Sequence, residues 1–88
     1  MNTMELIREK LASLRPSLID VTDESALHAG HAGAQSGGGH YRLRIVSAAF
    51  SQQNTLARHR LVYATLGNLM QNKIHALSIT AHCPEEIL

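Results

Sequence analysis

The stretch HYRLRIV at residues 40–46 shows a two-residue alternation of apolar with mostly polar or basic side chains. This period is typical of a β-strand that buries one face and leaves the other in solvent. Ser17–Glu24 shows a shorter alternation of the same kind, and Ile74–Ala81 predicts a third strand. The chain is therefore expected to form a three-stranded sheet.

Two helices are predicted from apolar residues at helical spacing. The first begins at Met4 and ends before Arg15-Pro16, because a residue that precedes proline disfavours the helical conformation. The second begins at Asn54 or Thr55, either of which can cap a helix, and ends near Asn72-Lys73. Both helices are long enough to cover one face of a small sheet.

The predicted order is helix, strand, strand, helix, strand, followed by a short terminal helix that Pro84 can open. Because a three-stranded sheet needs a helical layer over its apolar face, the predicted architecture is an α+β two-layer sandwich. Ser25–Gly39 carries five of the six glycines and is predicted to be a flexible loop. Without an internal repeat or linker, residues 1–88 are expected to form a single domain.

The composition narrows the functional classes. A formal net charge of +1, with no Trp, one Phe and two Tyr, gives little support for nucleic-acid binding by charge or stacking. The single cysteine, Cys83, excludes an intramolecular disulfide and a cysteine-rich zinc site. Charged residues interrupt the first 15 positions, so neither a signal peptide nor a membrane segment is expected, and the predicted location is cytoplasmic.

No set of catalytic residues is recognisable in the sequence. It contains no nucleophile elbow, no phosphate-binding loop before a helix, and no carboxylate pair with an adjacent base that the pattern can locate. We therefore expect a binding protein and not an enzyme.

Several longer runs resemble the signature of the BolA family. They are VTDES at 21–25, HAGHAG at 28–33, HYRLRIVSAAF at 40–50, RHRLVYATLGNLM at 58–70 and KIHALSITAHCPEE at 73–86. The resemblance implies an αββαβ domain related to class II KH folds. It also implies a protein that pairs with a monothiol glutaredoxin carrying a CGFS motif, with a [2Fe-2S] cluster shared between the two.

The same resemblance implies which residues bind the cluster. The family uses a His or Cys in the loop between the first two strands and the His of the IHAL motif, which is His75 here. His28 best matches the loop position, and His31 and His40 are nearby competitors. The remaining ligands would come from glutaredoxin and its glutathione, so the isolated chain, a monomer or weak homodimer, is expected to hold no cofactor.

Simpler interpretations exist for each histidine. From its pattern alone, His75 is more simply a histidine at the edge of the core, because it shares strand parity with Leu77 and Ile79; the IHAL match favours ligation instead. For His28, a solvated loop residue and a ligand are about equally plausible, and for His31 and His40 the solvated interpretation is favoured. His59, His82 and Cys83 are predicted to be structural or surface residues.

The alternative hypothesis is a KH-like DNA-binding transcriptional regulator that uses Arg58, Arg60 and Lys73. Its affinity would fall steeply with salt. Arg58 and Arg60 stand two apart on the predicted helix and so point to different sides. The chain also lacks the GXXG loop between helices with which KH domains hold a nucleic-acid backbone. A third hypothesis is a protein-interaction module that binds no metal.

One departure from the family pattern concerns the turn after Phe50. Family members commonly have a glycine two residues beyond this phenylalanine, whereas this chain has Ser51-Gln52. The turn is therefore expected to take a conformation that a non-glycine residue tolerates.

Overall fold

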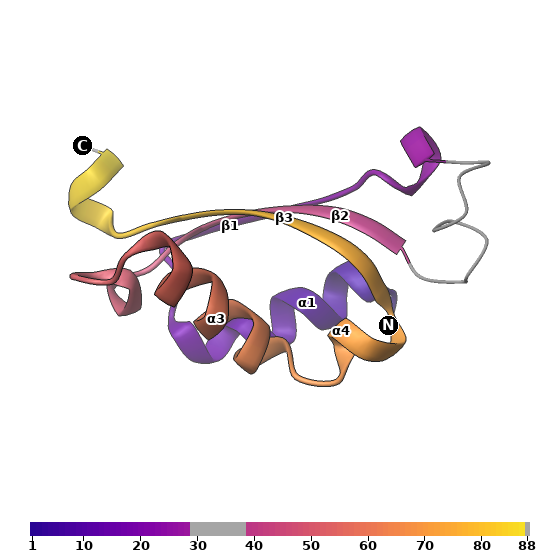
Figure 1. Cartoon of the computed structure of the whole chain (residues 1–88), viewed down its shortest axis with the longest axis horizontal. Helices are drawn as coiled ribbons and strands as arrows, with labels where there is room; N and C mark the ends of the chain where they lie inside the picture. Colours follow the sequence, from indigo (N-terminus) through magenta and orange to yellow (C-terminus); the bar gives the residue numbers. More distant parts are fainter. Residues whose placement is uncertain (29–38, 88) are drawn as a thin grey trace.

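The computed structural model describes residues 1–28 and 39–87. It is an α+β two-layer sandwich in which a three-stranded sheet forms one layer and the long helices lie against one of its faces (Figure 1). The strands are β1 (Leu18–Asp23), β2 (Gly39–Val46) and β3 (Ile74–His82). The predicted fold class is confirmed.

The helical layer is built from α1 (Thr3–Leu11), α3 (Thr55–Leu66) and α4 (Leu69–Asn72). These helices bury apolar side chains against the inner face of the sheet, and each fully buried large aliphatic side chain contributes about 1.5 to 3 kcal/mol. The fully buried members of this core are Ile7, Leu11, Leu43, Ile45, Val46, Phe50, Val62 and Leu66. No helix in the described part of the chain is both long and apolar enough to cross a membrane.

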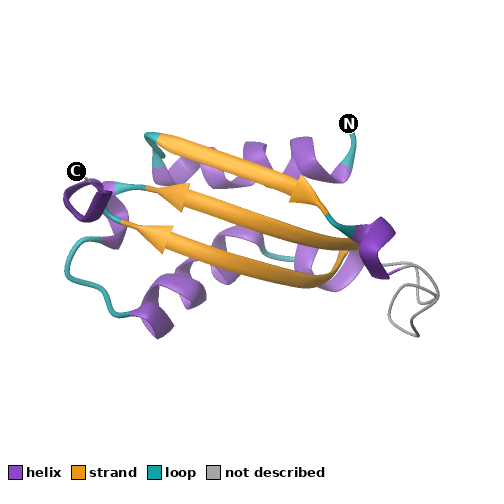
Figure 2. Cartoon of the chain, turned by 90° about the horizontal axis from the view of Figure 1, so that it is seen from above, coloured by secondary structure: helices purple, strands orange, loops and turns teal. Residues whose placement is uncertain are grey.

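The strand order in the sheet is β1-β2-β3, with β1 and β2 antiparallel and β2 and β3 parallel (Figure 2). A parallel pair needs a crossover connection, which α3 and α4 provide. As a result, β2 and β3 begin at the same end of the sheet. At that end Gly39 pairs with Ile74 and His40 pairs with Ala76, so His75 is one extra residue in β3, as in a β-bulge.

The second helical segment differs from its prediction. Asn54 caps α3 as expected, because its side-chain oxygen accepts a 2.8 Å hydrogen bond from the Ala57 N–H. The single helix expected to reach Asn72-Lys73 is wrong, however: α3 ends at Leu66 and α4 is a separate turn. Gly67 separates them at φ 58° and ψ −132°, a backbone conformation that L-residues rarely adopt.

The turn after Phe50 places a non-glycine residue at a positive φ. The Gln53 N–H donates to the Phe50 carbonyl at 3.1 Å, Ser51 has φ −57° and ψ 133°, and Gln52 has φ 62°. These values match a type II turn, whose third position requires a positive φ and favours glycine. Gln52 therefore occupies the left-handed conformation, which an L-residue tolerates at some steric cost and glycine adopts freely.

Candidate functional site

Two histidines lie side by side where β2 and β3 begin. The ring centroids of His40 and His75 are 5.1 Å apart, and the ring planes are tilted by 43°. His75 is exposed and His40 is half-buried. Of the four histidines predicted as ligands, these two are brought together by the described part of the structure.

The parallel pairing of β2 with β3 explains this proximity, and backbone hydrogen bonds fix it. The Gly39 N–H donates to the Lys73 carbonyl at 3.1 Å. The His40 N–H donates to Ser25 Oγ at 3.1 Å, and the His40 carbonyl accepts from the Glu24 N–H at 2.8 Å. The backbone of His40 is thus held by the chain that follows β1.

The segment after β1 has its own local support. Asp23 Oδ1 accepts a 2.8 Å hydrogen bond from the Ser25 N–H, and hydrogen bonds from the Ser25 side chain and backbone lower the pKa of Asp23. Ser25 opens the 3-10 helix Ser25–His28. The side chain of His28 and the whole of His31 lie outside the described part of the structure, so their predicted roles as ligands stay predictions.

The outer face of the sheet has a depression of about 320 Å³ next to His40, lined among others by Glu24, Arg42 and Ser78. Arg42 Nη2 and Glu24 Oε2 form an ion pair at 3.0 Å, and 64% of the Arg42 side chain is exposed. Such a solvated pair contributes little to stability. Its charges, however, place one cation and one anion in the depression that His40 also lines.

The two histidines fit a shared cluster better than a site within the chain alone. In the regions that the structure describes, no group of three or more His, Cys, Asp or Glu side chains is arranged to hold a metal ion. A closed tetrahedral zinc site needs four ligands, whereas two histidines can ligate one iron of a [2Fe-2S] cluster if thiolates ligate the other. The donor set at His40 and His75 is therefore suited to a site that a second molecule completes.

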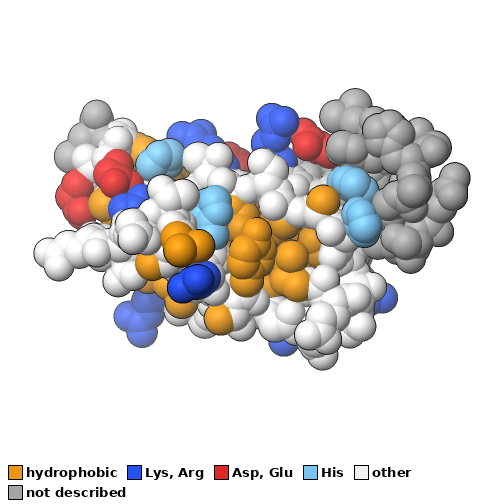
Figure 3. All heavy atoms as spheres, in the orientation of Figure 1, with side chains coloured by type: hydrophobic (Ala, Val, Ile, Leu, Met, Phe, Trp, Pro, Cys, Tyr) orange, Lys and Arg blue, Asp and Glu red, His pale blue; other side chains and the backbone are white. Residues whose placement is uncertain are grey.

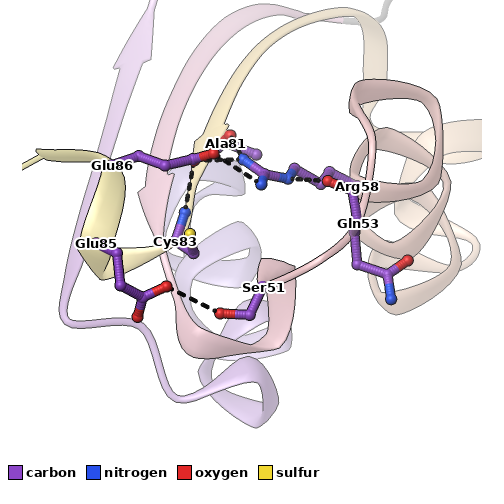
Figure 4. A network of polar contacts seen from close by, with 7 residues as sticks. All are labelled: Ser51, Gln53, Arg58, Ala81, Cys83, Glu85 and Glu86. Atoms are coloured by element: carbon purple, nitrogen blue, oxygen red, sulfur yellow. Dashed lines mark hydrogen bonds and ion pairs between the residues drawn. The ribbon is translucent and has the colours of Figure 1, made fainter.

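A second polar cluster lies at the opposite end of β3 (Figure 4). Arg58 is only 9% exposed, and its Nε donates to the Gln53 carbonyl at 2.8 Å. Its Nη1 donates to the Ala81 carbonyl at 3.0 Å, and Nη1 and Nη2 bind the two carboxylate oxygens of Glu86 at 2.6 and 3.0 Å. Glu86 Oε1 also accepts a 3.0 Å hydrogen bond from the Cys83 N–H. We call these five residues the Arg58 cluster.

The Arg58 cluster shifts the pKa of both ionised groups. The hydrogen bonds from Arg58, and then from the Cys83 backbone, lower the pKa of Glu86 to about 2, and the interaction with Glu86 raises the pKa of Arg58. The cluster ties α3, the end of β3 and the 3-10 helix Pro84–Ile87 together. Arg58 therefore has an internal structural role, and of the three cations predicted for nucleic-acid contact only Arg60 and Lys73 are exposed.

The sequence interpretation missed the Arg58 cluster. Arg58 and Glu86 are 28 positions apart, so no local spacing indicates their contact. The only signal was the arginine itself, which stands on the apolar side of α3 with Val62 and Leu66.

The fold is that of a small α+β domain with a three-stranded mixed sheet. The family model described as "BolA-like protein" matches residues 11–86. The chain belongs to the BolA-like family.

Two similar proteins come from Arabidopsis thaliana. SufE-like protein 1, chloroplastic/mitochondrial, is 44% identical over 87 residues, which cover 92% of this chain and 24% of that protein. Protein BOLA1, chloroplastic, is 39% identical over 97% of this chain and 56% of its own length. This chain thus spans about a quarter of the first protein and just over half of the second. A cytoplasmic location stays a prediction.

A bacterial relative and a solved structure extend the comparison. The DNA-binding transcriptional regulator BolA of Escherichia coli strain K12 is 36% identical, over 93% of this chain and 76% of that protein. The structure of BolA1 from Arabidopsis thaliana superposes with a TM-score of 0.85 at 38% identity, and covers 100% of this chain and 98% of that one. The fold of this chain is therefore the BolA fold.

Proposed function

We propose that this chain is a non-enzymatic adaptor that pairs with a monothiol glutaredoxin and shares a [2Fe-2S] cluster with it, in iron-sulfur trafficking or in iron and redox signalling. The observation that carries the proposal is the exposed His75 beside His40 at one end of the sheet. The cluster would supply an electron-accepting centre whose histidine ligands raise its reduction potential relative to all-cysteine ligation.

The chain's contribution to this site is the position of two imidazole rings. His75 is carried by β3, and the backbone of His40 is hydrogen-bonded on both sides. A ligand on a strand is already positioned, so its backbone loses little further entropy when it binds. This favours His40 as the partner of His75, although the family resemblance favours His28.

An imidazole binds iron only in its neutral form. Protonation of His75 or of its partner would therefore weaken cluster binding. We expect the shared cluster to be lost more readily at acidic pH than a cluster held by thiolates alone.

The test is anaerobic cluster reconstitution of this chain with a CGFS glutaredoxin and glutathione, followed by visible circular dichroism. We expect His75→Ala to change the spectrum of the pair. His40→Ala, His28→Ala and His31→Ala compared side by side identify the second ligand. His59→Ala on α3 is the matched control and should leave the spectrum unchanged. No complex, or a spectrum indifferent to all four ligand substitutions, would refute the proposal.

A DNA-binding regulator is the second candidate, and the observation that favours it is the name of the Escherichia coli relative. Here Arg60 and Lys73 would contact phosphates, while Arg58 serves the fold. Each phosphate contact contributes about −0.9 to the slope of log affinity against log salt. Fluorescence anisotropy with duplex DNA should then show a salt slope that becomes shallower by about that amount in Arg60→Ala. Binding that ignores both salt and Arg60→Ala would exclude this function.

A further inference from the structure

The outer edge of β3 is unusually open. β3 is a terminal strand of the sheet, and no other strand of the described chain pairs with its outer side. Its sequence IHALSITAH contains no Lys, Arg, Asp, Glu or Pro. Natural edge strands are commonly protected by such residues, because an unprotected edge pairs with other chains. The middle of this edge lacks such residues; the bulge at His75 and the hydrogen bond from Arg58 to the Ala81 carbonyl lie toward its two ends.

The hydrogen bonds at the end of β3 show which backbone groups face outward. The His82 carbonyl accepts from the Ser47 N–H at 2.9 Å and so points toward the β2 side. Because backbone groups alternate along a strand, those of Leu77, Ile79 and Ala81 point to the outer edge. Arg58 Nη1 binds the Ala81 carbonyl at 3.0 Å, which agrees with this assignment. The amides and carbonyls of Leu77 and Ile79 remain available.

An apolar surface lies directly below this edge. The side chains of Leu77 and Ile79 are only partly buried, as are Leu61 of α3 and Met70 of α4. Figure 3 shows hydrophobic side chains gathered in the middle of the face that the β3 edge presents. A second chain on this edge would therefore gain apolar burial as well as backbone hydrogen bonds.

The charges at the two ends of β3 indicate what pairs with the edge. Lys73 precedes the strand, and Glu85 follows it in the 3-10 helix Pro84–Ile87; both side chains are exposed. An antiparallel copy of the same strand would bring each Lys73 toward Glu85 of the second copy. A parallel copy would bring like charges together, which is unfavourable. The edge is thus complementary to itself in one orientation.

We propose that two copies of this chain associate through their β3 edges, antiparallel about a two-fold axis at Ser78. In this arrangement Leu77 pairs with Ile79 of the second copy, and the contact is the same on both chains. One added strand buries less than the roughly 1,200 Å² of a standard stable interface, so the dimer should be weak and depend on concentration. The proposal does not depend on cluster binding.

The first test follows amide hydrogen exchange by NMR at low and high concentration of the metal-free chain, with sedimentation velocity on the same samples. The amides of Ser78 and Thr80 face β2 and should be protected throughout. Those of Leu77 and Ile79 should become protected only at the higher concentration, together with a shift to a dimer. A chain that stays monomeric, with Leu77 and Ile79 unprotected, would overturn the proposal.

The second test uses charge reversal, which leaves the core untouched. Lys73→Glu and Glu85→Lys should each raise the dimer dissociation constant by roughly fivefold, about 1 kcal/mol, and the double variant should restore it. Leu77→Lys should raise it at least about tenfold, whereas the matched control Thr22→Lys on β1 should leave it unchanged. Absence of rescue in the double variant would rule out the antiparallel arrangement even if dimers form.

Discussion

The two ends of β3 use ionisable side chains in opposite ways. At its beginning, the exposed His75 lies beside His40, and the described chain offers too few ligands there to close a metal site. At its end, Arg58 is buried, and each of its three nitrogens donates to a carbonyl of the chain or to Glu86. Basic residues in a family motif are therefore not by themselves an interface: RHR contains a buried structural arginine, Arg58, and an exposed one, Arg60.

The largest effect is expected from Arg58→Ala. It removes the donor of the Gln53 and Ala81 carbonyls and leaves Glu86 with the Cys83 N–H as its remaining donor in the cluster, and hydrogen bonds to charged groups contribute about 1.5 to 3 kcal/mol each. We expect the free energy of unfolding, from urea titration, to fall by about 2 to 4 kcal/mol. Arg60→Ala is the control and should change it by less than about 0.5 kcal/mol. Equal losses for the two variants would mean that Arg58 has no structural role beyond that of an exposed arginine.

A smaller effect is expected at Glu86, because 41% of its side chain is exposed against 11% for Arg58. The pKa of Glu86 is lowered from 4.5 to about 2, so its stabilising contribution is complete above pH 4.5 and is lost as the pH falls toward 2. Glu86→Gln should therefore flatten the acid dependence of the urea midpoint in this window. Salt should weaken the difference. Parallel acid profiles for the two proteins would show that the ion pair is not stabilising.

Gln52→Gly, in the turn after Phe50, should raise the free energy of unfolding. Relief of the left-handed backbone is worth about 1 to 2 kcal/mol, and the greater freedom of glycine in the unfolded chain offsets about 0.5 to 1 kcal/mol. We expect the free energy of unfolding, measured by thermal unfolding, to rise by about 0.5 to 1 kcal/mol. Gln53→Gly, at a neighbouring position without a positive φ, should show no gain. A loss in both variants would contradict the turn geometry.

The smallest effect on stability is expected at His75. Because its side chain is exposed, His75→Ala should alter the free energy of unfolding by less than about 0.5 kcal/mol. The same substitution is expected to change the spectrum of the cluster-bearing pair. Loss of stability comparable to that of Arg58→Ala would make His75 a structural residue and would remove the contrast between the two ends.

Much of the fold could be predicted because it depends on local patterns. The period of two in residues 40–46 and the capping side chain of Asn54 are visible within a few residues, and both predictions are confirmed. The break at Gly67 was missed because a glycine within an apolar helical pattern is compatible with either a continuous or an interrupted helix. At Gln52, the residue type gave no indication of the positive φ that the turn requires.

The candidate site was less predictable because it depends on strand pairing. His40 and His75 are far apart in the sequence, and only the parallel arrangement of β2 with β3 brings their rings together. Periodicity indicates which face a residue occupies and not which strand lies beside it. His28 was ranked ahead of His40 because it matches the loop position of the family; the structure shows His40 beside His75 and does not describe the side chain of His28.

Because His75 is the extra residue of the bulge at the start of β3, the proximity of the His40 and His75 rings depends on a single codon. Since Gly39 pairs with Ile74 and His40 with Ala76, His75 is the one position of β3 that has no counterpart on β2. An in-frame deletion of that codon would leave a regular strand ladder and the same hydrophobic face. The gene can therefore lose the histidine pair in one step without a change in the folding pattern of the rest of the sheet.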